Sequence, residues 1–202
     1  RLIGGAGDDI YTVDNTRDIV RERSNHGVDL VEASVTYRIK NKNIENLDLI
    51  GSENINGTGN NSVNTIRGNS GANTLKGRGG DDNLFGGEDD DKLLGGLGND
   101  RLFGGDGNDH LIGGNGIDRL TGGIGDDTLI GGGGNDIFQI NSGLGRDVIT
   151  DYGTGNDRIK LLGGITSSDL TFGYVGGHTR INYDDDLLAI IQNTVADDIT
   201  FI

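Results

Sequence analysis

The sequence predicts an all-β protein built as a solenoid of stacked coils. Nine consecutive nine-residue units run without a break from Gly59 to Gln139. Glycine supplies 39 of the 202 residues, and each interior glycine costs a helix about 1 kcal/mol relative to alanine. A large apolar residue recurs at the eighth position, where it points inward from a strand of about three residues. So short a strand buries too little surface to be stable alone, and therefore the units must stack.

The repeat follows the pattern G-G-x-G-x-D-x-U-x, where U is a large apolar residue. Five copies without a departure from this pattern occupy Gly95 to Gln139, and an isolated copy, GGAGDDIYT, lies at Gly4 to Thr12. Glycine at positions 1, 2 and 4 permits backbone angles that are closed to residues with a Cβ. We expect a turn of this kind to point several carbonyl oxygens inward, next to the aspartate at position 6.

Such a turn offers oxygen ligands without nitrogen or sulfur, which is the donor set of a hard cation, and its irregular geometry suits Ca²⁺ better than Mg²⁺. Ordinary turn formation is the alternative, since Asp and Gly dominate turns in general. The candidate ligands are Asp82, Asp91, Asp100, Asp109, Asp118, Asp127 and Asp136, the isolated Asp9, and the glycines Gly96, Gly98, Gly105, Gly107, Gly114, Gly116, Gly123 and Gly125.

The tandem copies resemble the repeats-in-toxin (RTX) family of secreted bacterial calcium-binding proteins. The resemblance implies a right-handed parallel β-roll, in which two nonapeptides form one coil and Ca²⁺ ions lie between turns along both edges. It places Asp82, Asp100, Asp118 and Asp136 on one edge and Asp91, Asp109 and Asp127 on the other. It places Leu84, Leu93, Leu102, Leu111, Leu120, Leu129 and Phe138 in the interior.

Charge is consistent with several bound ions. The net charge at pH 7 is −15, and seven Ca²⁺ ions, one for each of these aspartates, would supply +14. We expect about five to eight ions. Position 6 is Asn64 and Asn73 in the first two units, where side-chain hydrogen bonding is favoured over calcium binding. Asp89 replaces a glycine at position 4 and is expected to distort its turn.

Three regions are predicted. Residues 1–58 form a degenerate β-coil region, residues 59–139 the tandem roll, and residues 140–202 a C-terminal β cap with a type I secretion signal. In the first region, alternating apolar residues predict short strands around 11–13, 35–39 and 47–49. The chain begins in mid-repeat, so it is expected to be part of a longer protein. The stacking partner of Asp9 is then expected upstream of Arg1.

The last region loses the nonapeptide but keeps apolar segments at 148–149, 159–161, 170–174, 180–183, 187–191 and 199–202, each predicted to be a strand. The segment GRDVITDYGTGNDRIKL resembles the cap that follows the roll in RTX proteins, and a solenoid needs a cap over its last coil. Asp147, Asp151 and Asp157 are candidates for one more ion, or for turn caps and salt bridges. The end, Asp197 to Ile202, resembles the uncleaved export signal of type I secretion substrates; a last edge strand is the alternative.

Position 9 carries apolar side chains on both faces of the predicted roll. Leu94, Ile112 and Ile130 would stack on one face, and Phe85 and Phe103 on the other. Mutual shielding between neighbouring coils is the simpler interpretation. Docking of another copy, or of domains of a parent protein, is the alternative.

Several functional classes are excluded or disfavoured. Cysteine is absent, which removes thiol catalysis, disulfides and thiolate metal sites. The acidic balance argues against nucleic-acid binding, and no apolar segment is long enough to be a transmembrane segment. The sequence lacks HExxH, a G-x-S-x-G elbow and a phosphate loop. We therefore expect no enzyme in this chain, although a parent protein could carry a catalytic domain upstream.

These observations predict a calcium-binding module that folds on Ca²⁺ outside the cell. It would serve as the folding, secretion or scaffold region of a secreted or cell-surface bacterial protein, with the type I secretion machinery as a partner. Two alternatives stay open: a structural subunit of a surface layer, adhesin or extracellular filament, and the C-terminal part of a secreted enzyme or toxin.

Overall fold

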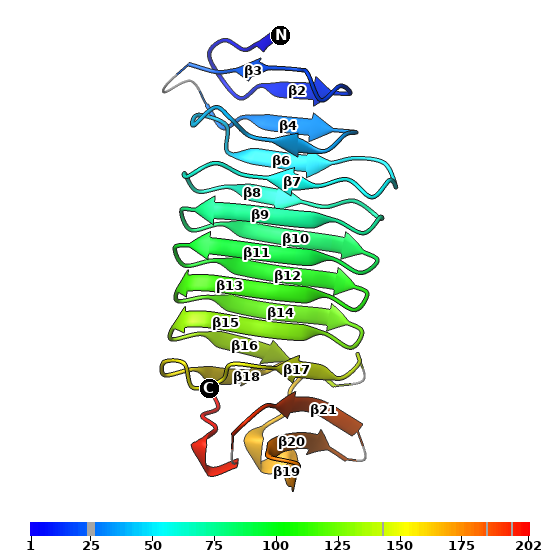
Figure 1. The fold of residues 1–202 in the computed structure, drawn as a ribbon, viewed down its shortest axis with the longest axis vertical. Coiled ribbons are helices and arrows are strands. Elements are labelled where there is room, and N and C mark those ends of the chain that lie inside the picture. Colours follow the sequence, from blue (N-terminus) through cyan, green and yellow to red (C-terminus); the bar gives the residue numbers. More distant parts are fainter. Residues whose placement is uncertain (24–26, 143, 185, 195) are drawn as a thin grey trace.

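The predicted all-β solenoid is confirmed in the computed structural model, which describes residues 1–23, 27–142, 144–184, 186–194 and 196–202. Coils stack along the long axis, and each coil of the roll places one strand in each of two parallel sheets (Figure 1). No helix among these residues has the length and apolar character needed to cross a membrane.

Within the described residues, one sheet has nine strands and the other has ten. The nine-stranded sheet contains β2 (Ile10–Val13), β4 (Leu30–Ala33), β6 (Asn46–Leu49), β8 (Thr65–Arg67), β10 (Asn83–Glu88), β12 (Arg101–Asp106), β14 (Arg119–Ile124), β16 (Ile137–Ile140) and β18 (Arg158–Leu161). The ten-stranded sheet contains β5 (Tyr37–Arg38), β7 (Gly57–Thr58), β9 (Thr74–Gly79), β11 (Lys92–Leu97), β13 (His110–Gly116), β15 (Thr128–Gly134), β17 (Asp147–Ile149), β21 (Asp186–Ile191), β20 (His178–Tyr183) and β19 (Leu170–Val175).

The remaining elements are short and lie outside the two sheets. The strands β1 (Leu2–Ile3) and β3 (Val20–Arg21) pair in parallel at the N-terminal end. Two 3₁₀ turns, η1 (Ser167–Asp169) and η2 (Ala196–Asp198), flank the C-terminal strands.

In the tandem repeats, the core is a stack of single apolar side chains, one for each strand from β8 to β15. In the ten-stranded sheet Leu93 lies opposite Leu111, which lies opposite Leu129, so the register repeats with every second nonapeptide. The seven predicted interior side chains are all 0% exposed: Leu84, Leu93, Leu102, Leu111, Leu120, Leu129 and Phe138. The eighth position of the nonapeptide therefore faces inward from both sheets, as predicted.

The strands of the repeats are longer than the three residues expected from the sequence. Those from β9 to β15 contain six or seven residues. Pairing resumes at the second glycine of the following unit, for example Gly105 opposite Gly123. Glycines of neighbouring coils thus come into contact through their backbones.

Two residues of the tandem roll occupy the left-handed region without being glycine. Asp89 has φ 71°, whereas Gly107 at the same position one coil later has φ 138°. The turn at Asp89 therefore departs from its neighbour's conformation, as expected. Arg78, at position 2 of its unit, has φ 91°, a conformation that costs a residue with a Cβ roughly 1–3 kcal/mol.

The apolar side chains at position 9 are half-buried. The rings of Phe85 and Phe103 stack with centroids 5.1 Å apart and planes 4° apart, and the Arg67 guanidinium lies 5.5 Å from the Phe85 centroid. Leu94, Ile112 and Ile130 lie opposite one another on adjacent strands. Each side chain covers part of the next, which favours shielding over docking.

The two sheets end differently at the C-terminus. The ten-stranded sheet continues from β17 to β21 in parallel and then turns antiparallel through β20 and β19. The nine-stranded sheet ends at β18, where the Ile159 amide donates to the Thr200 carbonyl and the Ile202 amide donates to the Ile159 carbonyl, at 2.8 and 3.0 Å. The strand predicted over 199–202 is only an isolated bridge at Phe201, because its pairing with β18 is limited to the two hydrogen bonds at Ile159.

Removing one layer of the core should destabilise the calcium-loaded roll. We expect Leu111→Ala to lower the free energy of unfolding by about 2–5 kcal/mol, because it leaves a cavity between two closely packed layers. Leu97→Ala makes the same change at a side chain that is 60% exposed, and should cost less than about 0.5 kcal/mol. Unfolding in denaturant measures the free energy of unfolding of each variant. Equal decreases for the two variants would contradict a core built from the position-8 side chains.

Candidate metal sites

The seven predicted aspartates lie in two buried rows, one along each edge of the roll. Asp82, Asp100, Asp118 and Asp136 precede strands of the nine-stranded sheet, and Asp91, Asp109 and Asp127 precede strands of the ten-stranded sheet. Each is at most 3% exposed. Carboxylates are rarely buried so completely without a charged partner.

One oxygen of each carboxylate holds the next coil in register. The backbone amide of Asp91 donates to Asp109 Oδ1, and that of Asp109 donates to Asp127 Oδ1, both at 2.8 Å. On the other edge, Asp100 N donates to Asp118 Oδ1 at 2.7 Å. Each bond joins equivalent positions of successive coils, so each row is a continuous ladder from coil to coil.

The second oxygen of each carboxylate has no hydrogen-bond partner. The buried Oδ2 atoms of Asp82, Asp91, Asp100, Asp109, Asp118, Asp127 and Asp136 are all unsatisfied. Leaving a buried acceptor unpaired costs about 1–3 kcal/mol, and more for a charged group. Seven unsatisfied carboxylate oxygens would destabilise a small protein that bound no cation. The arrangement therefore favours bound cations as the partners of these oxygens.

Each orphaned oxygen faces a glycine at position 1 of its own unit. A Cβ on Gly104 would overlap Asp109 Oδ2 and would lie 2.5 Å from the carbonyl oxygen of Gly122. The same relation holds at Gly95, where Asp100 Oδ2 and the Gly113 carbonyl are the neighbours. The missing Cβ therefore leaves a narrow space bordered by a carboxylate oxygen and a carbonyl oxygen, which are ligands that Ca²⁺ accepts.

The glycines predicted at positions 2 and 4 adopt conformations that favour glycine. Gly96, Gly98, Gly105, Gly107, Gly114, Gly116, Gly123 and Gly125 have φ between 119° and 139°. The carbonyl oxygen of Gly96 lies against the α carbon of Gly114, where a Cβ would overlap it. These positions therefore bring the carbonyls of one coil close to the next; their role as ligands stays a prediction.

Burial raises the pKa of every aspartate in the two rows. Desolvation raises the pKa of Asp109 to about 7 and that of Asp100 to about 6, against an ordinary value of 3.8. Hydrogen bonds from the backbone lower the pKa but do not offset burial. Neighbouring carboxylates, such as Asp91 and Asp127 around Asp109, raise it further. A divalent cation between them would reverse this balance.

The two asparagines at position 6 behave differently. Asn64 Oδ1 accepts from the Asn60 amide at 2.8 Å, and its Nδ2 donates to the carbonyls of Ile44 and Glu45 at 3.2 Å. Neither Asn64 nor Asn73 is among the described residues with an orphaned buried atom. The prediction that hydrogen bonds satisfy these amides is confirmed, and in the described part of the roll the unsatisfied atoms occur only where the repeat has aspartate.

Beyond the last repeat, the two rows continue with different spacing. Asp157 Oδ1 accepts from the Asp136 amide at 2.9 Å, 21 residues away, and its Oδ2 accepts from Gly153. Asp147 extends the opposite row; burial raises its pKa to about 8, and the nearby Asp127 carboxylate adds to the rise. Because Asp147 and Asp157 lie on opposite edges, the three predicted aspartates do not form one site.

Asp151 caps a turn. Its two carboxylate oxygens accept from the backbone amides of Gly131 and Gly132 at 3.0 and 2.7 Å. The turn-cap alternative is therefore confirmed for this residue.

Asp9 has a neighbour downstream that was not predicted from the sequence, and the partner expected upstream of Arg1 stays a prediction. The Asp9 amide donates to Asp29 Oδ1 at 2.9 Å, and Glu22 joins them, with one oxygen from each carboxylate within 4.8 Å of the others. Tyr11 donates its hydroxyl proton to Glu22. Asp29 was missed because its coil is longer than two nonapeptides, yet the segment Gly27–Val31 keeps the G-x-D-x-U spacing that could have indicated it. Glu22 carries no such signal.

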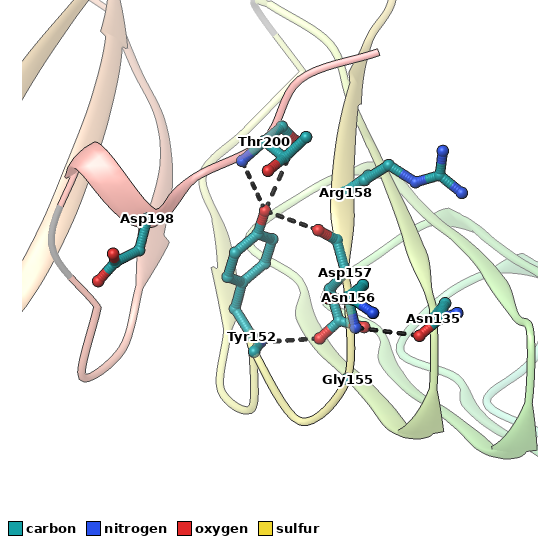
Figure 2. A pocket seen from close by; sticks show the side chains of 9 residues that line it. Asn135, Tyr152, Gly155, Asn156, Asp157, Arg158, Asp198 and Thr200 are labelled. Carbon is teal, nitrogen blue, oxygen red and sulfur yellow. Dashed lines mark hydrogen bonds between the residues drawn. The ribbon is translucent and has the colours of Figure 1, made fainter.

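A separate hollow of about 320 Å³ lies at the C-terminal end of the roll (Figure 2). The Tyr152 hydroxyl donates to the Asp157 carbonyl and accepts from the Thr200 amide, both at 2.9 Å. The Asn156 amide donates to Asn135 Oδ1 at 3.0 Å. The bonds of Tyr152 attach the C-terminal segment to the last coil, and the Asn156 bond joins that coil to the one before it. Arg158 and Asp198 also line the hollow.

Without bound metal, the roll should be stabilised by acid. Between about pH 4 and pH 7, the folded rows still hold protons that the unfolded carboxyls have released, so stability falls as pH rises through this range. We expect the chain in chelator to lack β structure at about pH 8 and to gain it at about pH 5. Circular dichroism measures the change. The opposite trend would show that the rows are not desolvated.

The family model of the RTX calcium-binding nonapeptide repeat (four copies) matches residues 1–20, 58–93, 85–120, 103–138 and 112–149. No curated protein matches the chain. Among solved structures, the chain is similar to the extracellular lipase LipA from Serratia marcescens, with 15% identity and a TM-score of 0.39. That match covers 88% of this chain and 44% of the lipase, so the chain spans less than half of the lipase's length. The matched repeats extend over more than half of the sequence, and the chain belongs to the family of RTX calcium-binding nonapeptide-repeat proteins.

Proposed function

We propose that this chain is a folding module that Ca²⁺ switches on outside the cell, within a secreted or cell-surface bacterial protein. The observation that carries the proposal is the pair of buried aspartate rows, in which one oxygen of each carboxylate is unsatisfied. Calcium binding is a property of the repeat family. The proposal adds the residues that bind the ions and the consequence of binding.

Asp82, Asp91, Asp100, Asp109, Asp118, Asp127 and Asp136 would supply the carboxylate ligands. Glycine carbonyls of neighbouring coils would supply the remaining protein oxygens. Bound Ca²⁺ neutralises the like charges that stacking brings together. Seven ions would add +14 to a chain of net charge −15, and about five to eight ions would suffice to remove most of the repulsion.

Ion binding and folding would then be one event. The ligands of a site come from two coils, so the site does not exist in the extended chain, and the free energy of binding contributes directly to folding. A cation that binds only the folded state shifts the equilibrium toward it as its concentration rises. Low calcium inside the cell would keep the chain extended, and higher calcium outside would fold it.

An extended chain is also the form that a secretion channel can pass. The segment Asp197 to Ile202 would act as the signal for type I secretion machinery. Thr200 and Ile202 are hydrogen-bonded to Ile159 in the folded chain, so recognition would precede folding. The module would itself have no catalytic role, and any enzymatic activity would reside in further domains of a parent protein.

The first test follows the far-UV circular dichroism of the chain in chelator during titration with Ca²⁺ and, separately, with Mg²⁺. We expect a cooperative transition from coil to β structure with Ca²⁺ and little response to Mg²⁺, which dehydrates reluctantly and demands near-octahedral geometry. If the chain is already rich in β structure in chelator at neutral pH, and if Ca²⁺ does not change its spectrum, the proposal is wrong. The aspartates would then serve only to form turns.

A second test compares two neutralising substitutions that lie close together in the sequence but differ in burial. Asp109→Asn removes a carboxylate from a buried row, and should raise the midpoint Ca²⁺ concentration for folding by about threefold or more. Asp106→Asn removes the same charge from an exposed side chain and should leave the midpoint nearly unchanged. Equal shifts for the two variants would mean that net charge, not the row, controls folding.

A further inference from the structure

The outward face of the nine-stranded sheet carries a track of basic side chains. Arg101 and Arg119 lie directly opposite each other on β12 and β14. Arg158 and Lys160 project from β18, on the far side of β16. In the first three residues of β8, β10, β12, β14, β16 and β18, no outward side chain is acidic. We call Arg101, Arg119, Arg158 and Lys160 the basic track.

The basic track has no acidic partner among the described residues. The salt bridges found there join Arg67 to Asp48 and Arg146 to Asp126, and neither involves a residue of the track. Stacked strands lie about 4.8 Å apart, and like charges directly opposite each other destabilise a sheet. Four unpaired cations on a chain of net charge −15 therefore form a local site for a negatively charged ligand.

We propose that the basic track binds an acidic polysaccharide, whose chain lies along the long axis of the roll and places carboxylate or sulfate groups on the arginines. The interaction goes beyond calcium-dependent folding but needs its product, since only the stacked coils bring residues 101, 119 and 158 to one face. An anion between Arg101 and Arg119 would also relieve their mutual repulsion.

The chemistry of the side chains favours this face over the opposite one. Three of the four cations of the track are arginines, whose planar fork matches carboxylate and sulfate oxygens. The corresponding positions of the ten-stranded sheet carry Arg38, Lys76 and Lys92, with the aliphatic Leu94, Ile112 and Ile130 on β11, β13 and β15. That face is less basic and offers fewer hydrogen-bonding groups.

The surroundings of the track favour a polysaccharide over a nucleic acid or a membrane. Single-stranded nucleic acids need open aromatic faces for their bases, but Phe85 and Phe103 stack on each other and Phe85 is also covered by Arg67. The exposed Asp81, Glu88 and Asp106 flank the face, and would repel a wide anionic surface such as a phospholipid bilayer.

A narrow chain avoids these flanks. Asn83 and Gln139 lie on the same face as the track and offer hydrogen bonds to sugar hydroxyls. The face therefore places neutral polar groups beside adjacent cations. An acidic sugar chain needs both, because it carries hydroxyl groups as well as negative charges.

The test uses the full chain in Ca²⁺, with dextran sulfate as the probe and uncharged dextran as its matched control. We expect dextran sulfate to bind and dextran not to bind. Arg101→Glu/Arg119→Glu should weaken binding by about tenfold or more, because it reverses two adjacent contacts. Lys76→Glu/Lys92→Glu makes the same change in net charge on the opposite face, and should change the affinity by less than about twofold.

Circular dichroism in Ca²⁺ first establishes that each variant is folded, so a failure of calcium-coupled folding is distinguished from a failure of this proposal. If the glutamate variant does not fold, Arg101→Gln/Arg119→Gln is compared with Lys76→Gln/Lys92→Gln. Equal loss in the two pairs, no binding of dextran sulfate by the folded chain, or tighter binding of a single-stranded oligonucleotide or of anionic phospholipid vesicles would each overturn the proposal.

Discussion

The structure depends on the electrostatic cost of stacking buried carboxylates. Each coil places an aspartate against its equivalent in the next coil, and the hydrogen bond that joins them also brings two negative groups together in a desolvated edge. The same side chain thus supplies an attractive and a repulsive interaction. A divalent cation bound as we propose would resolve this conflict, with the oxygen that the ladder leaves unpaired as its ligand.

Glycine makes this arrangement possible at the turns, and leucine makes it possible in the interior of the roll. Glycine at position 1 leaves room beside the carboxylate, and a Cβ there would close the space. Leucine at position 8 fills the interior in single file. In the tandem repeats each strand buries only one apolar side chain, and the conformational freedom of glycine opposes folding. Metal bound at the edges, as we propose, would therefore add stability to a thin core.

The ends of the solenoid use other devices. At the C-terminus, the ten-stranded sheet turns antiparallel, and the free edge of β18 accepts the segment around Phe201. These contacts cover strand edges that would otherwise pair with other chains. At the N-terminus, Asp9, Asp29 and Glu22 bring their carboxylates together. The regular packing of the repeat thus gives way at both ends to coils of unequal length, such as 20 residues from Ile10 to Leu30 and 16 from Leu30 to Asn46.

The sequence by itself determined the repeat, the inward apolar position and the oxygen donor set, because each follows from the nonapeptide period and from the local needs of glycine and aspartate. The two rows of aspartates were implied by the resemblance to the RTX family. The sequence also distinguished Asn64 and Asn73 from the aspartates. Only the tertiary structure decided what lies beyond that period. The pairing of Asp9 with Asp29, the place of Glu22, the separation of Asp147 from Asp157 and the unpaired arginines on one face depend on how coils of unequal length stack. Contacts between such coils are set by stacking and not by spacing along the chain.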